Sequence, residues 1–129
     1  MMRSTLIGAL ALMALTTAAR ADGDPAAGEK VFTQCKACHQ IGETAKNAVG
    51  PELNGLFGRH SGSVAGYNYS DANKNSGITW DETVFREYIK APRTKIPGTK
   101  MTFIGIKDDQ KIDDLIAFLK QFDADGKKK

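Results

Sequence analysis

The chain has 129 residues, of which 26% are charged and 41% hydrophobic, and its formal net charge at pH 7 is +3. So small a positive charge does not indicate a nucleic-acid binder. The chain holds only 2 cysteines, three positions apart, which could close only a very small disulfide loop.

The first 21 residues have the layout of a secretory signal peptide. Arg3 precedes an apolar run from Leu6 to Leu15, and the small-residue site Ala19-Arg20-Ala21 follows. This run is shorter than the ~20 residues that span a bilayer, which disfavours an uncleaved membrane anchor. We therefore expect export to the periplasm, cleavage after residue 21, and a single mature domain over residues 22–129 with no membrane span.

The mature chain begins with a predicted helix and continues with a long irregular segment. Asp24 is a candidate N-cap and Pro25 a favourable first helical residue, so the helix is expected to run from there to the cysteines or just past them. Residues 40–69 are rich in glycine and show neither strand alternation nor sustained helical periodicity. A loop of this length in a compact domain indicates that it encloses something.

Three further helices are expected in the second half of the chain. Ser70 can cap a short helix over 71–76, and Thr79 to Glu82 has the pattern of a capping box that opens a helix ended by Pro92. The last helix follows Asp108 or Asp109 and carries apolar residues at helical spacing, which we assign to the core: Ile112, Leu115, Ile116, Leu119 and Phe122. The polar residues from about 123 onward, DADGKKK, are expected to be a disordered basic tail.

Both cysteines lie in the segment VFTQCKACHQ, where Cys35, Cys38 and His39 form the pattern C-x-x-C-H. This pattern is the attachment motif of c-type haem. Residues i, i+3 and i+4 share one face of a helical turn, so two thiols can bond to the haem vinyl groups while the imidazole reaches the iron. We expect one haem c per chain, covalently bound through Cys35 and Cys38, with His39 as an iron ligand.

Three other roles for the cysteines fit the sequence less well. A thioredoxin-like redox pair needs a neighbouring βαβ pattern, and no strand precedes this motif. A zinc site needs four ligands, but the chain holds just two cysteines and two histidines, His39 and His60, without a pair at zinc-finger spacing. A structural disulfide is compatible with export, but it leaves His39 and the glycine-rich segment unexplained.

The sequence also restricts the second axial ligand of the iron. The other methionines lie in the predicted signal peptide, which leaves Met101 as the only methionine of the mature chain. It follows a Pro97-Gly98 turn that can direct a loop side chain. A thioether opposite histidine is the arrangement of electron-transfer haem proteins, so we expect His39 and Met101 to ligate the iron. A methionine that merely fills a gap in the core is the alternative.

Taken together, these segments resemble mitochondrial cytochrome c and its bacterial class I counterparts of the cytochrome c-two type. CKACH, GPELNGLFGR, YSDANKNSGITW, IPGTKM and DLIAFLK match family segments in order, over about Gly28 to Phe122. The resemblance implies an all-α fold of the small class I cytochrome c type, with helices packed around one covalently attached haem and long irregular wrapping loops. It also implies that Gly28 and Phe32 form the contact between the first and last helices.

The resemblance further implies residue roles around the haem. The carbonyl of Pro51 would accept the ring proton of His39, and Tyr88 would lie close to the Met101 sulfur. Hydrogen bonds to the haem propionates, or to their ordered water, would come from five residues: Arg59, Tyr69, Asn73, Trp80 and Thr99. Without the resemblance, Trp80 and Tyr88 would be assigned to the core.

An iron with both axial positions filled has no vacancy for a substrate, so the chain is expected to be a one-electron carrier and not an enzyme. A docking surface for acidic patches on redox partners is expected from six residues: Lys30, Lys36, Arg93, Lys95, Lys100 and Phe103. The resemblance suggests a cytochrome bc complex as donor and a terminal oxidase or a photosynthetic reaction centre as acceptor, and we expect a monomer.

Two other classes of protein stay open from the sequence. One is a ligand-binding or peroxidatic haem protein in which Met101 is absent from the iron or easily displaced. The other is a non-haem thiol protein that uses Cys35 and Cys38 for disulfide exchange, in which both thiols would be free to react with alkylating reagents.

Overall fold

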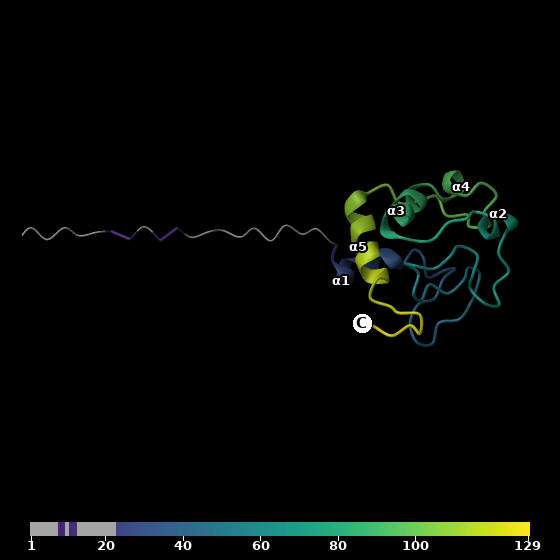
Figure 1. Cartoon of the computed structure of the whole chain (residues 1–129), viewed down its shortest axis with the longest axis horizontal. Helices are drawn as coiled ribbons and strands as arrows, with labels where there is room; N and C mark the ends of the chain where they lie inside the picture. Colours follow the sequence, from purple (N-terminus) through teal and green to yellow (C-terminus); the bar gives the residue numbers. More distant parts are fainter. Residues whose placement is uncertain (1–7, 10, 13–22) are drawn as a thin grey trace, which may run out of the picture.

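The computed structural model describes residues 8–9, 11–12 and 23–129. Its α-helices, in chain order, are α1 (Pro25–Phe32), α2 (Asp71–Lys74), α3 (Glu82–Lys90), α4 (Pro92–Lys95) and α5 (Asp109–Leu119). Figure 1 shows α1 crossing α5 at the left of the domain, with α3 and α4 to the upper right of this pair and the long loops to its lower right. The described part of the chain has isolated bridges in place of regular strands, which confirms the all-α prediction. The predicted signal peptide falls almost entirely outside the described residues.

The main helix contact joins the two ends of the domain. Gly28 of α1 lies so close to α5 that a Cβ built on it would be 1.9 Å from the carbonyl oxygen of Asp114. One turn further, the rings of Phe32 and Phe118 pack with their centroids 5.2 Å apart. The predicted contact of Gly28 and Phe32 with the last helix is therefore present, and it depends on glycine because any side chain would separate the two backbones.

A buried carboxylate ties the start of α1 to α5. Asp114 is only 8% exposed. Its Oδ1 accepts hydrogen bonds from the backbone N–H of Asp24 at 2.9 Å and from Nε2 of Gln110 at 3.0 Å. Asp24 in turn caps α1, because its side chain accepts from the N–H of Ala26. The N-cap of one helix is thus held by a side chain of the other.

The first helix ends earlier than the sequence predicts. Its α-helical hydrogen bonding stops at Phe32, and tighter bonds from Thr33 to Lys30 and from Cys35 to Phe32 carry the chain into a series of turns. The prediction that the helix reaches the cysteines is wrong. The cysteines lie instead on the turns that follow it, because bonds between residues three apart replace the helical ladder after Phe32.

The later helices follow the predicted caps in part. Ser70 caps α2 and Asp108 caps α5, each accepting from the backbone N–H three residues on, although α2 ends at Lys74, short of the predicted end. The capping box at Thr79 is wrong, because Asp81 is the N-cap of α3. Pro92 does follow the end of α3, and it opens the short helix α4, which the sequence analysis did not predict.

The C-terminal residues differ most from expectation, because they are ordered. The N–H of Lys129 donates to the carbonyl oxygen of Gln121 at 2.8 Å, and Nζ of Lys128 lies 5.8 Å from the ring centroid of Phe122. Gly126 is buried with φ +77°, and a Cβ there would lie 2.1 Å from the carbonyl oxygen of Gly42. The tail folds back because this glycine lets its backbone pack against the loop that follows the C-x-x-C-H motif.

The core lies between the helices and the loops. It is formed by buried side chains from both parts of the chain: Phe32, Leu56, Trp80, Phe85, Tyr88, Ile89, Ile96, Ile106, Ile112, Leu115, Ile116, Phe118, Leu119 and Phe122. The predicted apolar stripe of the last helix is therefore core, as expected. Residues 40–69 form turns without a helix, also as expected. None of the helices in the described residues has the length and apolar character needed to cross a bilayer.

Replacing Gly28 with alanine is expected to lower the free energy of unfolding by about 1–3 kcal/mol, because the added methyl group has to displace α1 from α5. Urea denaturation of the purified protein measures this change. Glu29→Ala, at an exposed position of the same helix, is the matched control and should change the free energy by less than about 0.5 kcal/mol. Equal losses in the two variants would contradict the close backbone contact.

Candidate functional site

A cavity of about 500 Å³ lies between the core and the irregular segment. Its walls include apolar core side chains such as Phe32, Leu56 and Leu119. Every residue that the sequence analysis places around a haem lies in its lining: Cys35, Cys38, His39, Pro51, Arg59, Tyr69, Asn73, Trp80, Tyr88, Thr99 and Met101. A mostly apolar cavity with a few convergent polar groups is typical of a cofactor site.

The C-x-x-C-H motif forms one tight turn on the cavity wall. The backbone N–H groups of Cys38 and His39 both donate to the carbonyl oxygen of Cys35, at 3.1 and 2.9 Å. The two cysteines are half-buried and are not joined to each other in a disulfide. Burial, with a smaller contribution from Cys38, raises the pKa of the Cys35 thiol to about 11. This thiol is therefore protonated at neutral pH, which disfavours a role in disulfide exchange.

The imidazole of His39 is oriented through its Nδ1 atom. Nδ1 lies 2.7 Å from the carbonyl oxygen of Pro51, and because a carbonyl can only accept, Nδ1 must carry the proton. The pKa of His39 is lowered overall. Burial is the largest cause, the hydrogen bond to Pro51 acts in the opposite direction, and the charge of Arg59 lowers the pKa further. The ring is thus neutral at pH 7 and Nε2 has a free lone pair. Gly50 makes room for it, since a Cβ there would lie 2.4 Å from Cε1 of the ring.

The sulfur of the Met101 thioether accepts a hydrogen bond from another side chain. The hydroxyl of Tyr88 donates to Sδ of Met101 at 2.9 Å. Burial raises the pKa of Tyr88 to about 12, although a hydrogen bond with Thr99 lowers it, so the hydroxyl keeps its proton at physiological pH. Upstream, Gly98 has φ +88°, which allows the predicted turn before Met101. The sulfur therefore has a defined position on the cavity wall.

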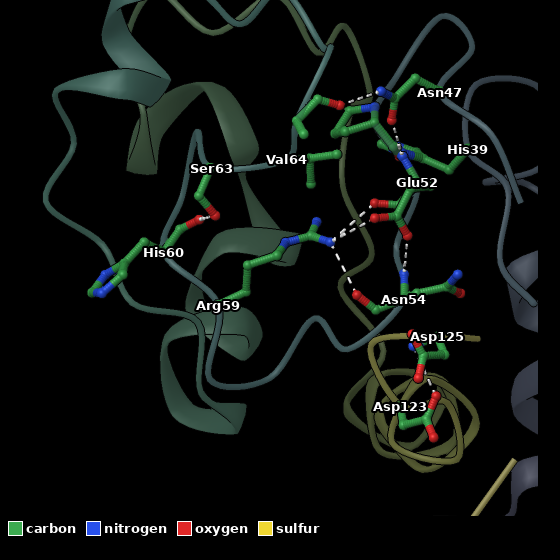
Figure 2. A network of polar contacts seen from close by, with 12 residues as sticks. His39, Asn47, Glu52, Asn54, Arg59, His60, Ser63, Val64, Asp123 and Asp125 are labelled. Carbon is green, nitrogen blue, oxygen red and sulfur yellow. Dashed lines mark hydrogen bonds and ion pairs between the residues drawn. The ribbon is translucent and has the colours of Figure 1, made fainter. Parts of the chain in front are cut away.

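A polar network holds Arg59 on another part of the wall, as Figure 2 shows. Nη1 of Arg59 donates to the carbonyl oxygens of Glu52 and Asn54, both at 3.1 Å, and lies 3.6 Å from Oε1 of Glu52. Oε2 of Glu52 accepts from the N–H of Asn54 at 2.6 Å. The pKa of Arg59 is lowered overall, because the effect of burial exceeds the opposing effects of Tyr69 and Glu52. The guanidinium stays charged and is fixed in direction.

Of the four other residues with predicted propionate contacts, Trp80 is buried with its ring packed on that of Tyr88, centroids 4.8 Å apart. The other three form hydrogen bonds within the chain. Oδ1 of Asn73 accepts from the hydroxyls of Ser70 and Thr99, each at 2.9 Å. The hydroxyl of Tyr69 accepts from the N–H of Val64 at 3.0 Å. These side chains lie on the same cavity, and their binding roles stay predictions.

The predicted docking residues are less uniformly placed. Lys100 and Phe103 line the cavity, whereas four others lie outside its lining: Lys30, Lys36, Arg93 and Lys95. Lys95 pairs with Glu87 at 2.8 Å. Nζ of Lys100 donates to the carbonyl oxygen of Asn68 at 3.1 Å. Lys30 and Lys36 are exposed.

Sequence reasoning missed four residues at this site. Val49 and Ile104 line the cavity although they are 73% and 85% exposed, so they lie at its rim. Glu52 pairs with Arg59, and Ser61 lines the cavity with a buried hydroxyl. Only for Glu52 did the sequence contain a local signal, namely an acidic residue directly after Pro51. The other three positions depend on contacts between distant segments.

These residues fit a haem that is bound through two thioether bonds. The thiols share a turn with a neutral imidazole, Gly50 leaves space for the ring, and apolar walls surround a cavity that also holds a thioether and a guanidinium. The fold and the site together define a haem protein of the c type.

Comparisons with known proteins agree. The family model described as Cytochrome c matches residues 25–123. Cytochrome c2 of Blastochloris viridis is 63% identical over 128 residues, 99% of this chain and 100% of that protein. Cytochrome c-550 of Nitrobacter winogradskyi is 64% identical over 107 residues, 83% of this chain and 98% of that protein. The solved structure of cytochrome cH from Methylobacterium extorquens is 51% identical, with a TM-score of 0.72 over 77% of this chain and 99% of that one.

The chain therefore belongs to the cytochrome c family, as a class I bacterial member. Its cofactor is haem c, attached covalently through Cys35 and Cys38. The family consists of electron carriers, so the general activity of the chain is electron transfer.

Glu52→Gln is expected to lower the free energy of unfolding of the haem-loaded protein by about 1 kcal/mol, because the variant loses the charge that pairs with Arg59. Glutamine keeps an oxygen that can accept from the N–H of Asn54, so the loss reports the charge. Glu43→Gln removes the same charge at an exposed position and should have little effect. Added salt should reduce the difference between the variants, and a difference that grows with salt would contradict the ion pair.

Proposed function

We propose that this protein is a soluble periplasmic one-electron carrier in which His39 and Met101 are the two axial ligands of the haem iron. The observation that supports the proposal is that both side chains line one cavity and each is oriented by another residue. Pro51 accepts the Nδ1 proton of His39, which leaves Nε2 free to bind a metal. Tyr88 donates to the Met101 sulfur, which retains a further lone pair.

The bound haem supplies an iron that gains and loses one electron. The residues of the chain determine what else that iron can do. With His39 and Met101 bound to it, the iron would have no free position for oxygen or a substrate. The apolar walls around the cavity exclude water and favour the less charged, reduced state, so the reduction potential is expected to be relatively high.

We infer that the carrier docks on acidic surfaces of membrane-bound redox complexes. The donor would be a cytochrome bc complex, and the acceptor a terminal oxidase or a photosynthetic reaction centre. The exposed Lys36, in the turn between the two cysteines, supports this inference because it places positive charge next to the attachment site. The exposed apolar side chains of Val49 and Ile104 at the cavity rim would supply the apolar centre of the interface. The signal-peptide pattern supports the periplasmic location.

Met101→Ala tests the second axial ligand directly. The variant is expected to keep its covalent haem, to lose the methionine-to-iron charge-transfer band of the oxidised protein, and to bind carbon monoxide when reduced. Truncation of the partly buried side chain should also lower the free energy of unfolding by about 2–5 kcal/mol.

The matched control for this experiment is Thr102→Ala, an exposed neighbour on the same segment, which should retain the band and exclude carbon monoxide. Carbon monoxide binding by the unaltered protein would favour the ligand-binding class of haem protein over the carrier. If the purified protein contained no haem, this result would favour a non-haem thiol protein that uses Cys35 and Cys38 for disulfide exchange.

The charge of the docking surface can be tested with small oxidants. Oxidation of the reduced protein by anionic hexacyanoferrate(III) should slow as salt rises, whereas oxidation by a cationic cobalt(III) chelate should accelerate. Lys36→Glu should slow the anionic reaction by a factor of roughly 2–5 at low salt. Lys111→Glu, an equal charge change at an exposed position in the first turn of α5, should have a smaller effect. Equal effects of the two variants would contradict a localised surface.

A further inference from the structure

A buried side-chain amide ties the loop after the cysteine motif to the segment that follows Pro51. Asn54 is only 8% exposed. Its Oδ1 accepts from the backbone N–H of Gly42 and its Nδ2 donates to the carbonyl oxygen of the same residue, each at 2.9 Å. Because a buried polar group without a partner is costly, these two bonds hold the amide in one orientation.

The backbone of Asn54 holds the ion pair on the wall of the cofactor cavity. Its N–H donates to Oε2 of Glu52 at 2.6 Å, and its carbonyl oxygen accepts from Nη1 of Arg59 at 3.1 Å. Glu52 and Arg59 also pair with each other. By fixing its own backbone, the side chain of Asn54 therefore fixes the groups that direct the guanidinium of Arg59.

The end of the chain folds into a compact turn next to Asn54. In residues 123–126, here called the C-terminal turn, the N–H of Gly126 donates to the carbonyl oxygen of Asp123 at 3.0 Å. Oδ1 of Asp123 accepts from the N–H groups of Asp125 and Lys127, both at 2.9 Å. Figure 2 shows Asp123 and Asp125 below Asn54 in the view. The turn is thus held together by hydrogen bonds of its own.

The C-terminal turn covers the amide of Asn54. A Cβ built on Gly126 would lie 2.7 Å from Nδ2 of Asn54 and 2.1 Å from the carbonyl oxygen of Gly42. A Cβ on Gly55 would lie 2.9 Å from the Cα atom of Ala124 in the same turn. Glycine at these two positions lets the backbones touch, so the turn shields the bonds between Asn54 and Gly42 from water.

Arg59 lies between the cofactor cavity and a second, more open hollow. That hollow is lined in part by the exposed residues Lys46 and Ala124, the latter from the C-terminal turn. Among the described residues, Arg59 is the one that lines both the cavity and the hollow. A guanidinium released from its acceptors would therefore have room to turn away from the cofactor and toward solvent.

We propose that Asn54 is a positioning residue for Arg59: covered by the C-terminal turn, it keeps the guanidinium on the wall of the cofactor cavity. The inference deepens the proposed function and rests on it, because it takes the haem iron in this cavity as the redox centre. A positive charge near the iron favours the reduced state, which carries less positive charge, and so raises the midpoint potential. A guanidinium that turned into the second hollow would lose part of this effect to solvent screening.

The test removes the amide of Asn54 and keeps the backbone groups that contact Glu52 and Arg59. Midpoint potentials are measured for Asn54→Ala, for Arg59→Gln and for the double variant, all as full-length, haem-loaded proteins. We expect Arg59→Gln to lower the potential because it removes the charge, and Asn54→Ala to lower it by part of that amount. In the double variant the effect of Asn54→Ala should vanish, because no charge is left to position. Thr44→Ala, a neutral change at an exposed position of the loop after Gly42, should keep the potential of the unaltered protein.

Gly126→Ala tests the cover without altering Asn54. The added methyl group should displace the C-terminal turn, because this position has φ +77° and no space for a Cβ. The potential should fall as in Asn54→Ala but by less, and this fall should also vanish in combination with Arg59→Gln. If Asn54→Ala loads no haem, the result for Gly126→Ala decides the inference in the same way.

The inference is overturned by any of three results. A potential that loss of the amide leaves unchanged, whatever happens to the free energy of unfolding, would make Asn54 a purely structural residue. A fall that persists in the double variant would show that Asn54 acts on the iron without Arg59. An unchanged potential in Arg59→Gln would mean that Asn54 has no charge to position.

The methionine-to-iron charge-transfer band of the unaltered protein, recorded in the same series, separates this inference from the proposed function. Absence of the band would contradict the proposed axial ligands. The comparison of potentials among the variants would still report whether Asn54 acts through Arg59.

Discussion

The close approach of α1 and α5 is the contact on which the rest of this domain depends. Gly28 allows the two backbones to touch, and Asp114 ties the N-cap of α1 to α5. Phe32, Leu115 and Leu119 belong both to the core of this contact and to the wall of the cavity. Helix packing and cofactor binding therefore share the same side chains. In so small a domain the haem is in effect part of the core, because its apolar faces cover surface that the chain alone leaves open.

The site is organised as pairs, in which one residue acts and another orients it. Pro51 orients His39, Tyr88 orients Met101, and Glu52 holds Arg59. For the two proposed iron ligands, His39 and Met101, the orienting group leaves a lone pair free to bind the iron. The Nδ1 proton of His39 is occupied while Nε2 stays free, and the Tyr88 bond leaves the sulfur with a further lone pair. With His39 and Met101 as the proposed ligands, such pairs would keep the reorganisation between oxidation states small, because each ligand would be held in place.

Most of what could be predicted from the sequence depends on residues that lie close together along the chain. The C-x-x-C-H motif, the caps at Asp24, Ser70 and Asp108, and the helix end before Pro92 are short-range signals, and the structure contains each of them. Thr79 misled because Asp81, a stronger N-cap, lies two residues on. The first helix was predicted too long because nothing local marks the change to tighter turns after Phe32. The roles of the residues that are predicted to contact the haem came from family resemblance and not from their spacing.

What could not be predicted depends on segments that meet only in three dimensions. The position of Ser61 requires the pairing of residues 58–61 with 78–80, which no local pattern in either segment indicates. Asp114 lies within an otherwise apolar helical face. Its burial is compensated by a hydrogen bond from the N–H of Asp24, 90 residues away along the chain. The ordered tail likewise requires Gly126 to meet Gly42, and the polar composition of DADGKKK gives no sign of it.

The folded C-terminal tail, residues 123–129, determines how the protein is oriented when it is attached to a surface by that end. The chain ends at Lys129 with its backbone amide already bonded to Gln121, and the neighbouring Gly126 lies against the loop after the cysteine motif. A linker added after Lys129 would therefore emerge beside the end of α5 and not from a free strand of chain. A carrier tethered to an electrode by this end would approach the support with a defined side of the molecule, and its current would report that one orientation.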